Sequence, residues 1–243
     1  ERARLMHSAP GDGGMAVVFA DEATVAPALA GRESRLAIAA VNGPHNTVLS
    51  GDIVELEAAL NDLRAQGVDA KRLVVSHAFH SPLMDGVLDE FERFAARFEY
   101  APPLVPIASN VTGALITDAN QPADWPRYWR DHLRGAVRFA DGVAAAAATR
   151  ATQWIEIGPA PVLAGMAAKC DAPFADRPQW LPSLRPGADD NRTLAAALAA
   201  HWAAGGEVDW RAVWRGRPAK RLPLPNYPWK RERYWYENLH PRG

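Results

Sequence analysis

The stretch Arg35-Leu-Ala-Ile-Ala-Ala-Val-Asn-Gly-Pro-His-Asn-Thr-Val-Leu-Ser-Gly-Asp52 contains two β-rich apolar runs separated by a turn cluster. Asparagine and glycine tolerate left-handed backbone and proline presets φ, so the segment 42–46 favours a tight turn. The two runs are therefore expected to pair as a hairpin. Asp52 is suited to cap a helix, with Glu55 three residues later as its capping-box partner.

Further strands and helices are expected on either side of this hairpin. Strands are expected over Met15–Phe19 and Lys71–Val75, and a helix over Ala23–Ala30. A second helix follows Asp52, where apolar residues recur at helical spacing: Ile53, Leu56, Ala59, Leu60 and Leu63. The order β-α-β-β-α-β over residues 14–75 is the split-βαβ, ferredoxin-like arrangement.

The chain after residue 76 has a different pattern. We expect helices over Pro82–Tyr100, Trp125–Leu133, Phe139–Ala148, Val162–Ala168 and Arg192–Ala204, and strands over Val105–Ser109, Trp154–Ile157 and Trp180–Leu184. A strand followed by Gly158-Pro159 and a helix is an α/β element. The predicted fold class is α/β with an α+β insert, in four segments: 1–13, 14–76, 77–178 and 179–243.

Composition excludes several classes of function. The 27 basic and 28 acidic residues give a net charge of −1, which does not favour binding to nucleic acid or to an anionic membrane. Cys170 is the single cysteine, so an internal disulfide and a cysteine-cluster metal site are excluded. No apolar run approaches the ~18–20 residues of a membrane-spanning helix, and we expect a cytoplasmic protein. The chain opens Glu-Arg-Ala-Arg without a methionine, so we expect it to be a piece of a longer polypeptide.

Candidate chemistry lies in Ser76-His-Ala-Phe-His-Ser-Pro-Leu-Met84. This segment follows an expected strand and precedes an expected helix, where a histidine general base can face a cleft. A histidine that caps the helix or is satisfied in the core is the structural alternative. Zinc binding by His77 and His80 is another, although no third ligand has suitable spacing. The sequence contains neither a G-x-S-x-G nucleophile elbow nor a glycine-rich phosphate loop.

Six segments in order resemble the acyltransferase domain of a modular type I polyketide synthase, of the malonyl type. They are Arg2-Ala-Arg-Leu-Met6, Ala40-Val-Asn-Gly-Pro44 with Val48-Leu-Ser-Gly51, His77-Ala-Phe-His-Ser81, Tyr128-Trp-Arg-Asp-His-Leu133 with Val137-Arg-Phe139, Glu156-Ile-Gly-Pro-Ala-Pro-Val-Leu163, and the segment 222–235. The resemblance covers essentially the whole chain and corresponds to the C-terminal two-thirds of such a domain with its following linker. It implies an α/β-hydrolase-like large subdomain that carries a ferredoxin-like small subdomain.

The resemblance also implies a reaction and roles for individual residues. The family transfers a malonyl group from malonyl-CoA to a serine, and then to the phosphopantetheine thiol of an acyl carrier protein. His80 is the expected catalytic base, oriented by the backbone carbonyl of His132. Arg2 is expected to bind the malonyl carboxylate, although by itself it is typical of a solvated helix end. Asn42 matches a position near the pantetheine arm, although Asn-Gly-Pro is also ordinary turn chemistry.

His77 and Phe79 carry the expected substrate specificity. Family members with His-Ala-Phe-His at this position usually take malonyl groups, and those with Tyr-Ala-Ser-His usually take methylmalonyl groups. Phe79 would fill the space that a serine leaves for an α-methyl group, a difference of ~1–3 kcal/mol. No metal or tightly bound cofactor is expected, because the phosphopantetheine belongs to the carrier protein.

The chain departs from the family's pattern at two points. Ala160 stands where relatives usually have histidine in Gly-Pro-His-Pro. The family's G-H-S-x-G elbow lies before the arginine matched by Arg2, so the nucleophilic serine is expected upstream of this chain. The alternative is a catalytically inactive structural or docking module of a polyketide synthase.

The C-terminal segment implies partners. As the linker that follows the acyltransferase, it is expected to contact the ketosynthase and linker domains of the same synthase. Its anchors would be four aromatic residues: Tyr227, Trp229, Tyr234 and Trp235. A nucleic-acid patch in this basic segment is the alternative. The other expected partners are the acyl carrier protein and the N-terminal part of the acyltransferase.

Overall fold

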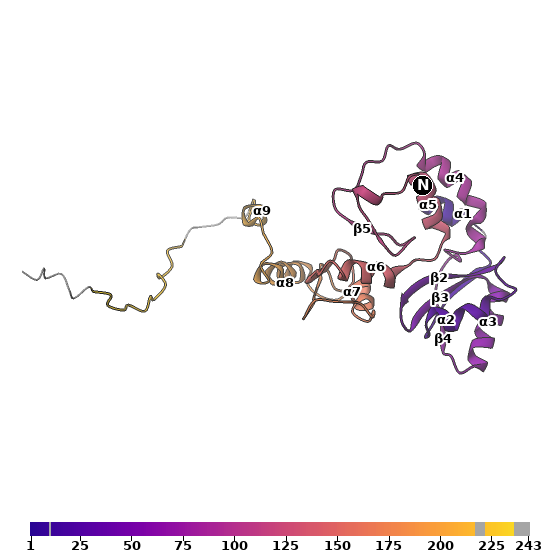
Figure 1. Ribbon diagram of the computed structural model, residues 1–243, viewed down its shortest axis with the longest axis horizontal. Helices are drawn as coiled ribbons and strands as arrows, with labels where there is room; N and C mark the ends of the chain where they lie inside the picture. Colours follow the sequence, from indigo (N-terminus) through magenta and orange to yellow (C-terminus); the bar gives the residue numbers. More distant parts are fainter. Residues whose placement is uncertain (10, 217–221, 236–243) are drawn as a thin grey trace, which may run out of the picture. The chain divides into compact units, whose positions relative to one another are not determined.

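The structure of the protein, a computed structural model, describes residues 1–9, 11–216 and 222–235 (Figure 1). It divides into two compact units, Glu1–Gly205 and Gly206–Gly243. In its described residues, the second unit contains one short helix, α9 (Trp210–Val213), and an exposed segment, 222–235, without helix or strand. All other elements belong to the first unit.

A four-stranded antiparallel sheet forms the first part of the fold. Its strands are β1 (Gly13–Val18), β2 (Leu36–Gly43), β3 (Asn46–Asp52) and β4 (Ala70–Arg72), in the order β2-β3-β1-β4. This is the strand order of a ferredoxin-like sheet, as predicted from the β-α-β-β-α-β pattern. The fourth strand is shorter than expected, because β1 pairs with Ala70–Arg72 while Val74 and Val75 are exposed.

One face of this sheet is covered by α2 (Glu22–Val25), the 3₁₀ turn η1 (Ala26–Leu29) and α3 (Ile53–Ala65). A single helix was expected over Ala23–Ala30. Pro27 has no N–H to continue the α-helical bonds, and the chain tightens into a 3₁₀ turn there. The core between sheet and helices consists of fully buried apolar residues, among them Ala16, Val18, Leu36, Leu49, Leu56, Leu60 and Leu63.

Asp52 caps α3 as predicted, accepting from the backbone N–H groups of Val54 (3.0 Å) and Glu55 (3.2 Å). The reciprocal half of the capping box is replaced. The N–H of Asp52 donates to the carbonyl of Arg35 at 2.9 Å, while the Glu55 carboxylate lies 3.5 Å from Arg32. The Glu55 carboxylate therefore faces Arg32 and does not accept the hydrogen bond from the Asp52 N–H that would complete the capping box.

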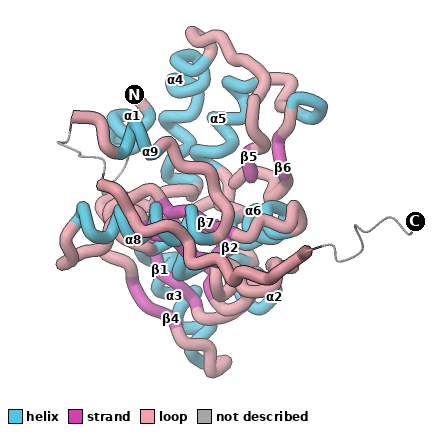
Figure 2. Tube along the Cα trace, turned by 90° about the vertical axis from the view of Figure 1, so that its left-hand side faces the viewer, coloured by secondary structure: helices cyan, strands magenta, loops and turns pink. Residues whose placement is uncertain are grey.

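Three helices pack together beside the sheet: α1 (Arg2–Ser8), α4 (Asp85–Ala95) and α5 (Trp125–Arg134) (Figures 1 and 2). The 3₁₀ turn η2 (Pro82–Met84) leads into α4, so the predicted helix over Pro82–Tyr100 begins tightly wound and ends earlier. Their shared core is Leu5, Met84, Val87, Leu88, Phe91 and Leu133. Ion pairs from Arg130 to Glu92 (2.7 Å) and from Arg134 to Asp85 (2.5 Å) join α5 to α4.

The last part of the first unit is an α/β arrangement. Strands β7 (Gln153–Glu156) and β8 (Gln179–Pro182) are parallel, and the helices around them are α6 (Phe139–Ala147), α7 (Val162–Ala167) and α8 (Asp190–Ala203). A two-residue antiparallel pair, β5 (Ile107–Ala108) and β6 (Leu115–Ile116), precedes the 3₁₀ turn η3 (Asp118–Asn120). Among the described residues, no helix combines the length and the apolar character that a membrane crossing needs.

Candidate active site

His80 lies in the connection between β4 and η2, with its backbone in the left-handed region at φ 58°. A non-glycine residue held there costs about 1–3 kcal/mol, and such strain is concentrated at functional sites. Its Nδ1 is 2.9 Å from the carbonyl oxygen of Gly135. Because a carbonyl only accepts, Nδ1 carries the proton, and Nε2 of the neutral ring keeps a free lone pair.

The orienting carbonyl differs from the one expected. The prediction gave this role to the backbone of His132, but the carbonyl in contact with His80 belongs to Gly135. Helix α5 ends at Arg134, and Gly135 is extended at φ −74° and ψ 166°, which turns its carbonyl away from the helix. A side chain here is disfavoured, because a Cβ on Gly135 would lie 2.9 Å from the carbonyl oxygen of Asp131.

The environment of His80 favours the neutral imidazole. Burial lowers the pKa of His80, and the positive charge of Arg2 lowers it further, while the bond to the Gly135 carbonyl acts in the opposite direction. A neutral ring is the form that accepts a proton. The residue expected to be the base is therefore oriented, partly buried and predominantly unprotonated near neutral pH.

Arg2 and Arg4 lie on the same helix, but their surroundings are different. Arg4 forms ion pairs with Glu1 (2.6 Å) and Glu90 (2.8 Å). The Nε of Arg2 is buried without a hydrogen-bond partner among the described residues, and burial lowers the pKa of its guanidinium. Arg2 is half-buried, and a buried N–H donor such as its Nε is costly unless an acceptor satisfies it. The description of a solvated helix end therefore fits Arg4 and not Arg2.

The His132 ring also belongs to this cluster, which sequence reasoning did not foresee. Its centroid lies 6.5 Å from that of His80, and Tyr128 and Trp129 surround it on α5. Burial, Arg2 and His80 lower the pKa of His132 to about 4. Its Nδ1 is buried and has no partner within the described part of the chain. Arg2 is thus the permanent cation beside two neutral imidazoles.

His77 and Phe79 are structural neighbours of this site. His77 is buried, with its ring 5.2 Å from that of His7 and 5.9 Å from that of Phe79. Phe79 packs both on the core of α1, α4 and α5 and on the second face of the sheet, against Met15, Ala39 and Val48. Its ring therefore fills the space between the ferredoxin-like sheet and the helices.

Ala78, between these two rings, is fully buried. A Cβ added at Gly13 would approach the Cβ of Ala78 to 2.5 Å, so the motif lies directly on the start of β1. Ser81 donates to the carbonyl of Ala78 at 2.6 Å and accepts from the N–H of Leu83 at 3.3 Å. These contacts fix the backbone on both sides of His80.

Asn42 is engaged in its own hairpin. Its side-chain amide donates to the side-chain oxygen of Asn46 at 3.2 Å, and its carbonyl accepts from the Cys170 thiol at 3.3 Å. These contacts are turn chemistry and a link to the segment after α7. Proximity of Asn42 to a pantetheine arm stays a prediction.

Glu156 is a residue whose role the sequence did not indicate. Its carboxylate accepts from the backbone N–H groups of Val162 (3.1 Å), Leu163 (3.0 Å) and Ala164 (2.7 Å) at the start of α7. Ala160 lies in the loop between Glu156 and α7, and the hydrogen bonds of the Glu156 carboxylate join the two ends of this loop. In the described residues no group of three His, Cys, Asp or Glu side chains is arranged to hold a metal ion.

A histidine oriented by a backbone carbonyl, close to an arginine without an ion-pair partner in the described residues and next to a ferredoxin-like sheet, agrees with the expected acyltransferase class. The sequence profile described as "Acyl transferase domain" matches residues 1–207, and the chain belongs to this family. It is 40% identical over 238 residues to polyketide synthase GfsA of Streptomyces halstedii, which covers 98% of this chain and 3% of that protein. It is 40% identical over 235 residues to the mycoketide-CoA synthase of Mycobacterium tuberculosis, which covers 96% and 5%.

Solved structures agree with this assignment. The acyltransferase domain from the second module of the salinomycin polyketide synthase is 39% identical with a TM-score of 0.84, over 92% of this chain and 52% of that chain. A malonyl-CoA:acyl carrier protein transacylase from Xanthomonas oryzae is 27% identical with a TM-score of 0.70, over 82% and 62%. The chain thus spans about half of a solved acyltransferase domain and a few per cent of the curated relatives.

Proposed function

We propose that this chain supplies the base and the carboxylate-binding arginine of a malonyl-specific acyltransferase in a polyketide synthase. The malonyl group would pass from malonyl-CoA to a serine, and then to the phosphopantetheine thiol of an acyl carrier protein. The observation that carries the proposal is that two groups occur in one site. His80 is held by the Gly135 carbonyl, and Arg2 has a buried Nε without a hydrogen-bond partner in the described residues. The serine would lie in a segment N-terminal to Glu1, in keeping with the 52% coverage of a solved domain.

His80 would move one proton in each half-reaction. The Nε2 lone pair takes the proton of the serine hydroxyl as its oxygen attacks the thioester carbonyl, and returns it to the coenzyme A sulfur as the C–S bond breaks. The second transfer reverses these steps, with the carrier's thiol as the nucleophile. The lowered pKa of His80 suits both directions, since the ring must be neutral at the start of each.

Arg2 would select acyl groups that end in a free carboxylate. The malonyl carboxylate would supply the anion that the Arg2 guanidinium lacks, through charge-assisted hydrogen bonds. His132 supports this role because its ring stays neutral and does not repel the guanidinium further. An acetyl group offers no such partner.

The partners would be those of a synthase module. The segment 222–235 presents four exposed aromatic side chains, Tyr227, Trp229, Tyr234 and Trp235, at 69–89% exposure. Exposed aromatic rings of this kind are typical anchors of protein interfaces, and we assign them to the ketosynthase and its linker. The expected tail continues into residues 236–243, which lie outside the described residues.

The test compares two arginines of one helix. In the acyltransferase that joins this chain to its serine-bearing segment, Arg2→Ala should lower malonyl transfer from malonyl-CoA roughly 100-fold or more, and acetyl transfer from acetyl-CoA much less. Arg4→Ala is the matched control, because its partners are the exposed Glu1 and Glu90. Equal losses with both substrates would remove the role assigned to Arg2. Absence of any labelled acyl-enzyme would favour the inactive docking module instead.

Specificity is tested at Phe79 by competition between malonyl-CoA and methylmalonyl-CoA. Phe79→Ser opens space between the sheet and the helices, and should shift the ratio of kcat/KM values toward methylmalonyl by about 10- to 100-fold. Phe79→Leu keeps an apolar side chain and should shift it less. A wild-type enzyme that prefers methylmalonyl-CoA would overturn the malonyl assignment.

A further inference from the structure

The carbonyl that orients His80 belongs to a short extended segment, Gly135–Arg138, which we call the strap. One end of the strap leaves α5 at Gly135, whose N–H donates to the carbonyl of Asp131 at 2.7 Å. Its middle lies along β2, the edge strand of the ferredoxin-like sheet. There Val137 donates to the carbonyl of Ala39 at 2.8 Å and accepts from the N–H of Val41 at 2.9 Å. The strap therefore links His80, which contacts the Gly135 carbonyl, to the edge strand β2 of the ferredoxin-like sheet.

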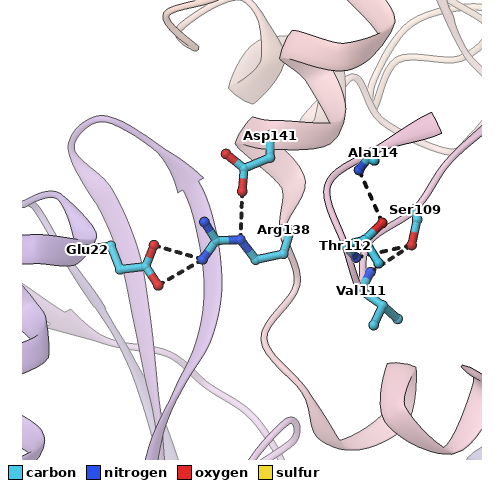
Figure 3. Close-up of polar contacts among 7 residues, drawn as sticks. All are labelled: Glu22, Ser109, Val111, Thr112, Ala114, Arg138 and Asp141. Atoms are coloured by element: carbon cyan, nitrogen blue, oxygen red, sulfur yellow. Dashed lines mark hydrogen bonds and ion pairs between the residues drawn. The ribbon is translucent and has the colours of Figure 1, made fainter.

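Arg138 closes the strap with three further contacts. Its Nη1 lies 2.8 and 2.7 Å from the two carboxylate oxygens of Glu22 on α2, and its Nε lies 2.6 Å from Asp141 on α6 (Figure 3). Its backbone N–H donates to the carbonyl of Asn110 at 2.8 Å. Glu22 is 116 residues away in the sequence, so this one guanidinium joins two regions that the chain forms separately.

The turn that contains Asn110 is itself held in place. Ser109 accepts from the N–H groups of Val111 (3.1 Å) and Thr112 (3.2 Å), as Figure 3 shows. Gly113 has φ +72°, and a Cβ there would lie 2.3 Å from the Cβ of Asp141. The carboxylate of Asp141 is thus confined on one side by this turn and on the other by Arg138. Besides the backbone bonds of Val137 and Arg138, the Arg138 guanidinium is therefore the side-chain tie that fixes the C-terminal end of the strap.

We propose that Arg138 is a positioning residue, which holds the Gly135 carbonyl against His80 by tying the strap to Glu22 of the ferredoxin-like subdomain. The inference rests on the proposed function, in which His80 is the base. The ion pairs of Arg130 and Arg134 join α4 and α5, two helices that already pack together. The ion pair of Arg138 instead joins the strap to the ferredoxin-like subdomain. As a consequence of this link, the position of the ferredoxin-like subdomain would affect the orientation of the His80 ring.

The electrostatic consequence follows from the groups that face His80. These are Arg2 from α1, His132 from α5 and the Gly135 carbonyl from the strap. Of these, only the carbonyl bond raises the pKa of His80, whereas Arg2 lowers it. Release of the strap should therefore lower the pKa of His80 and allow the proton of the neutral ring to move from Nδ1 to Nε2. An Nε2–H ring has no lone pair on the nitrogen that would serve as base.

The experiment is imidazole ¹⁵N NMR on the 243-residue chain, with His80 assigned by loss of its signals in His80→Gln. Arg138→Gln and Glu22→Gln should each shift His80 toward the Nε2–H tautomer and lower its pKa. Glu22 lies on the surface of α2, so its variant keeps the test decisive if Arg138→Gln does not fold. The double variant should add little to either single change. Arg72→Gln, which breaks an exposed Arg–Glu pair with Glu57 in the same subdomain, should leave His80 unchanged.

A folded Glu22→Gln variant in which His80 keeps its tautomer and pKa would overturn the inference. The same changes in the complete acyltransferase should lower kcat for malonyl transfer roughly ten- to hundredfold, with little change in KM for malonyl-CoA. Wild-type enzyme without malonyl transfer would reject the proposed function, whereas the NMR result would still report on the strap. The two failures are therefore distinguishable.

Discussion

The four-stranded sheet and the β7–β8 pair are both small sheets, but they bury their apolar side chains to very different extents. In the four-stranded sheet, α3 covers one face and Phe79 lies on the other, and Leu49 is fully buried. In the β7–β8 pair, Trp154 and Trp180 pack inward with Phe174, while Ile155 faces solvent at 54% exposure and Ile157, just after β7, is 89% exposed.

The difference follows from how each sheet is assembled. The antiparallel sheet is built from consecutive segments that also supply the helices covering one face, so residues 13–72 complete the core on that face. Parallel strands are typically buried on both faces, and in the described residues one face of β7–β8 is open. Residues of the four-stranded sheet should therefore contribute more to the stability of this chain than residues of the β7–β8 pair.

The largest effect is expected from truncation in the closed core. Leu60→Ala removes a fully buried side chain between α3 and the sheet, and should lower the free energy of unfolding by about 2–5 kcal/mol. Ile155→Ala, at an exposed position of β7, should change it by less than about 0.5 kcal/mol. Urea unfolding of both variants measures the contrast. Similar losses at both positions would show that the β7–β8 pair is as well packed as the sheet.

A smaller effect is expected where the sheet meets the histidine motif. Gly13→Ala would place a Cβ 2.5 Å from that of Ala78 and 2.9 Å from the carbonyl of Gly51, and should cost about 1–3 kcal/mol. Gly165→Ala is the matched control in α7, because no atom lies within 4 Å of its added Cβ. Alanine is the better helix former there, so this variant should gain about 0.5–1 kcal/mol. Thermal melting would contradict the comparison if both variants moved the same way.

The smallest effect is expected at Glu156. Glu156→Gln keeps the shape of the side chain but removes the charge that three backbone N–H groups share at the start of α7. We expect a loss of about 0.5–1.5 kcal/mol, measured by urea unfolding beside the exposed control Glu33→Gln. A loss confined to amides of α7 in hydrogen exchange would sharpen the comparison, since it would mark this helix as a separate cooperative unit.

Local patterns in the sequence predicted most elements, because turns, caps and helical spacing involve residues close in the chain. The hairpin around Asn42–Asn46, the cap at Asp52 and the helix over Trp125–Leu133 are all present within a few residues of their expected bounds. The strand over Lys71–Val75 was too long, because an apolar run becomes a strand only where a partner strand pairs with it. Likewise, Pro27 shortened α2 once the chain had to turn toward β2.

The candidate site divides in the same way. The motif around His80 and the resemblance it carries were visible in the sequence, and family membership is now established. The identity of the orienting carbonyl was not, because it depends on where α5 ends and how Gly135 is turned. The lone charge of Arg2 against the ion-paired Arg4 was equally hidden, since both are arginines of one short helix.

The sequence by itself determined the ferredoxin-like strand order, the α/β class and the histidine motif, because each is written in short-range spacing of residue types. The tertiary structure alone decided which groups meet: Gly135 with His80, Arg138 with Glu22, and Arg2 with no carboxylate among the described residues. These contacts join residues 55 and 116 positions apart, or depend on burial, and no local pattern encodes either.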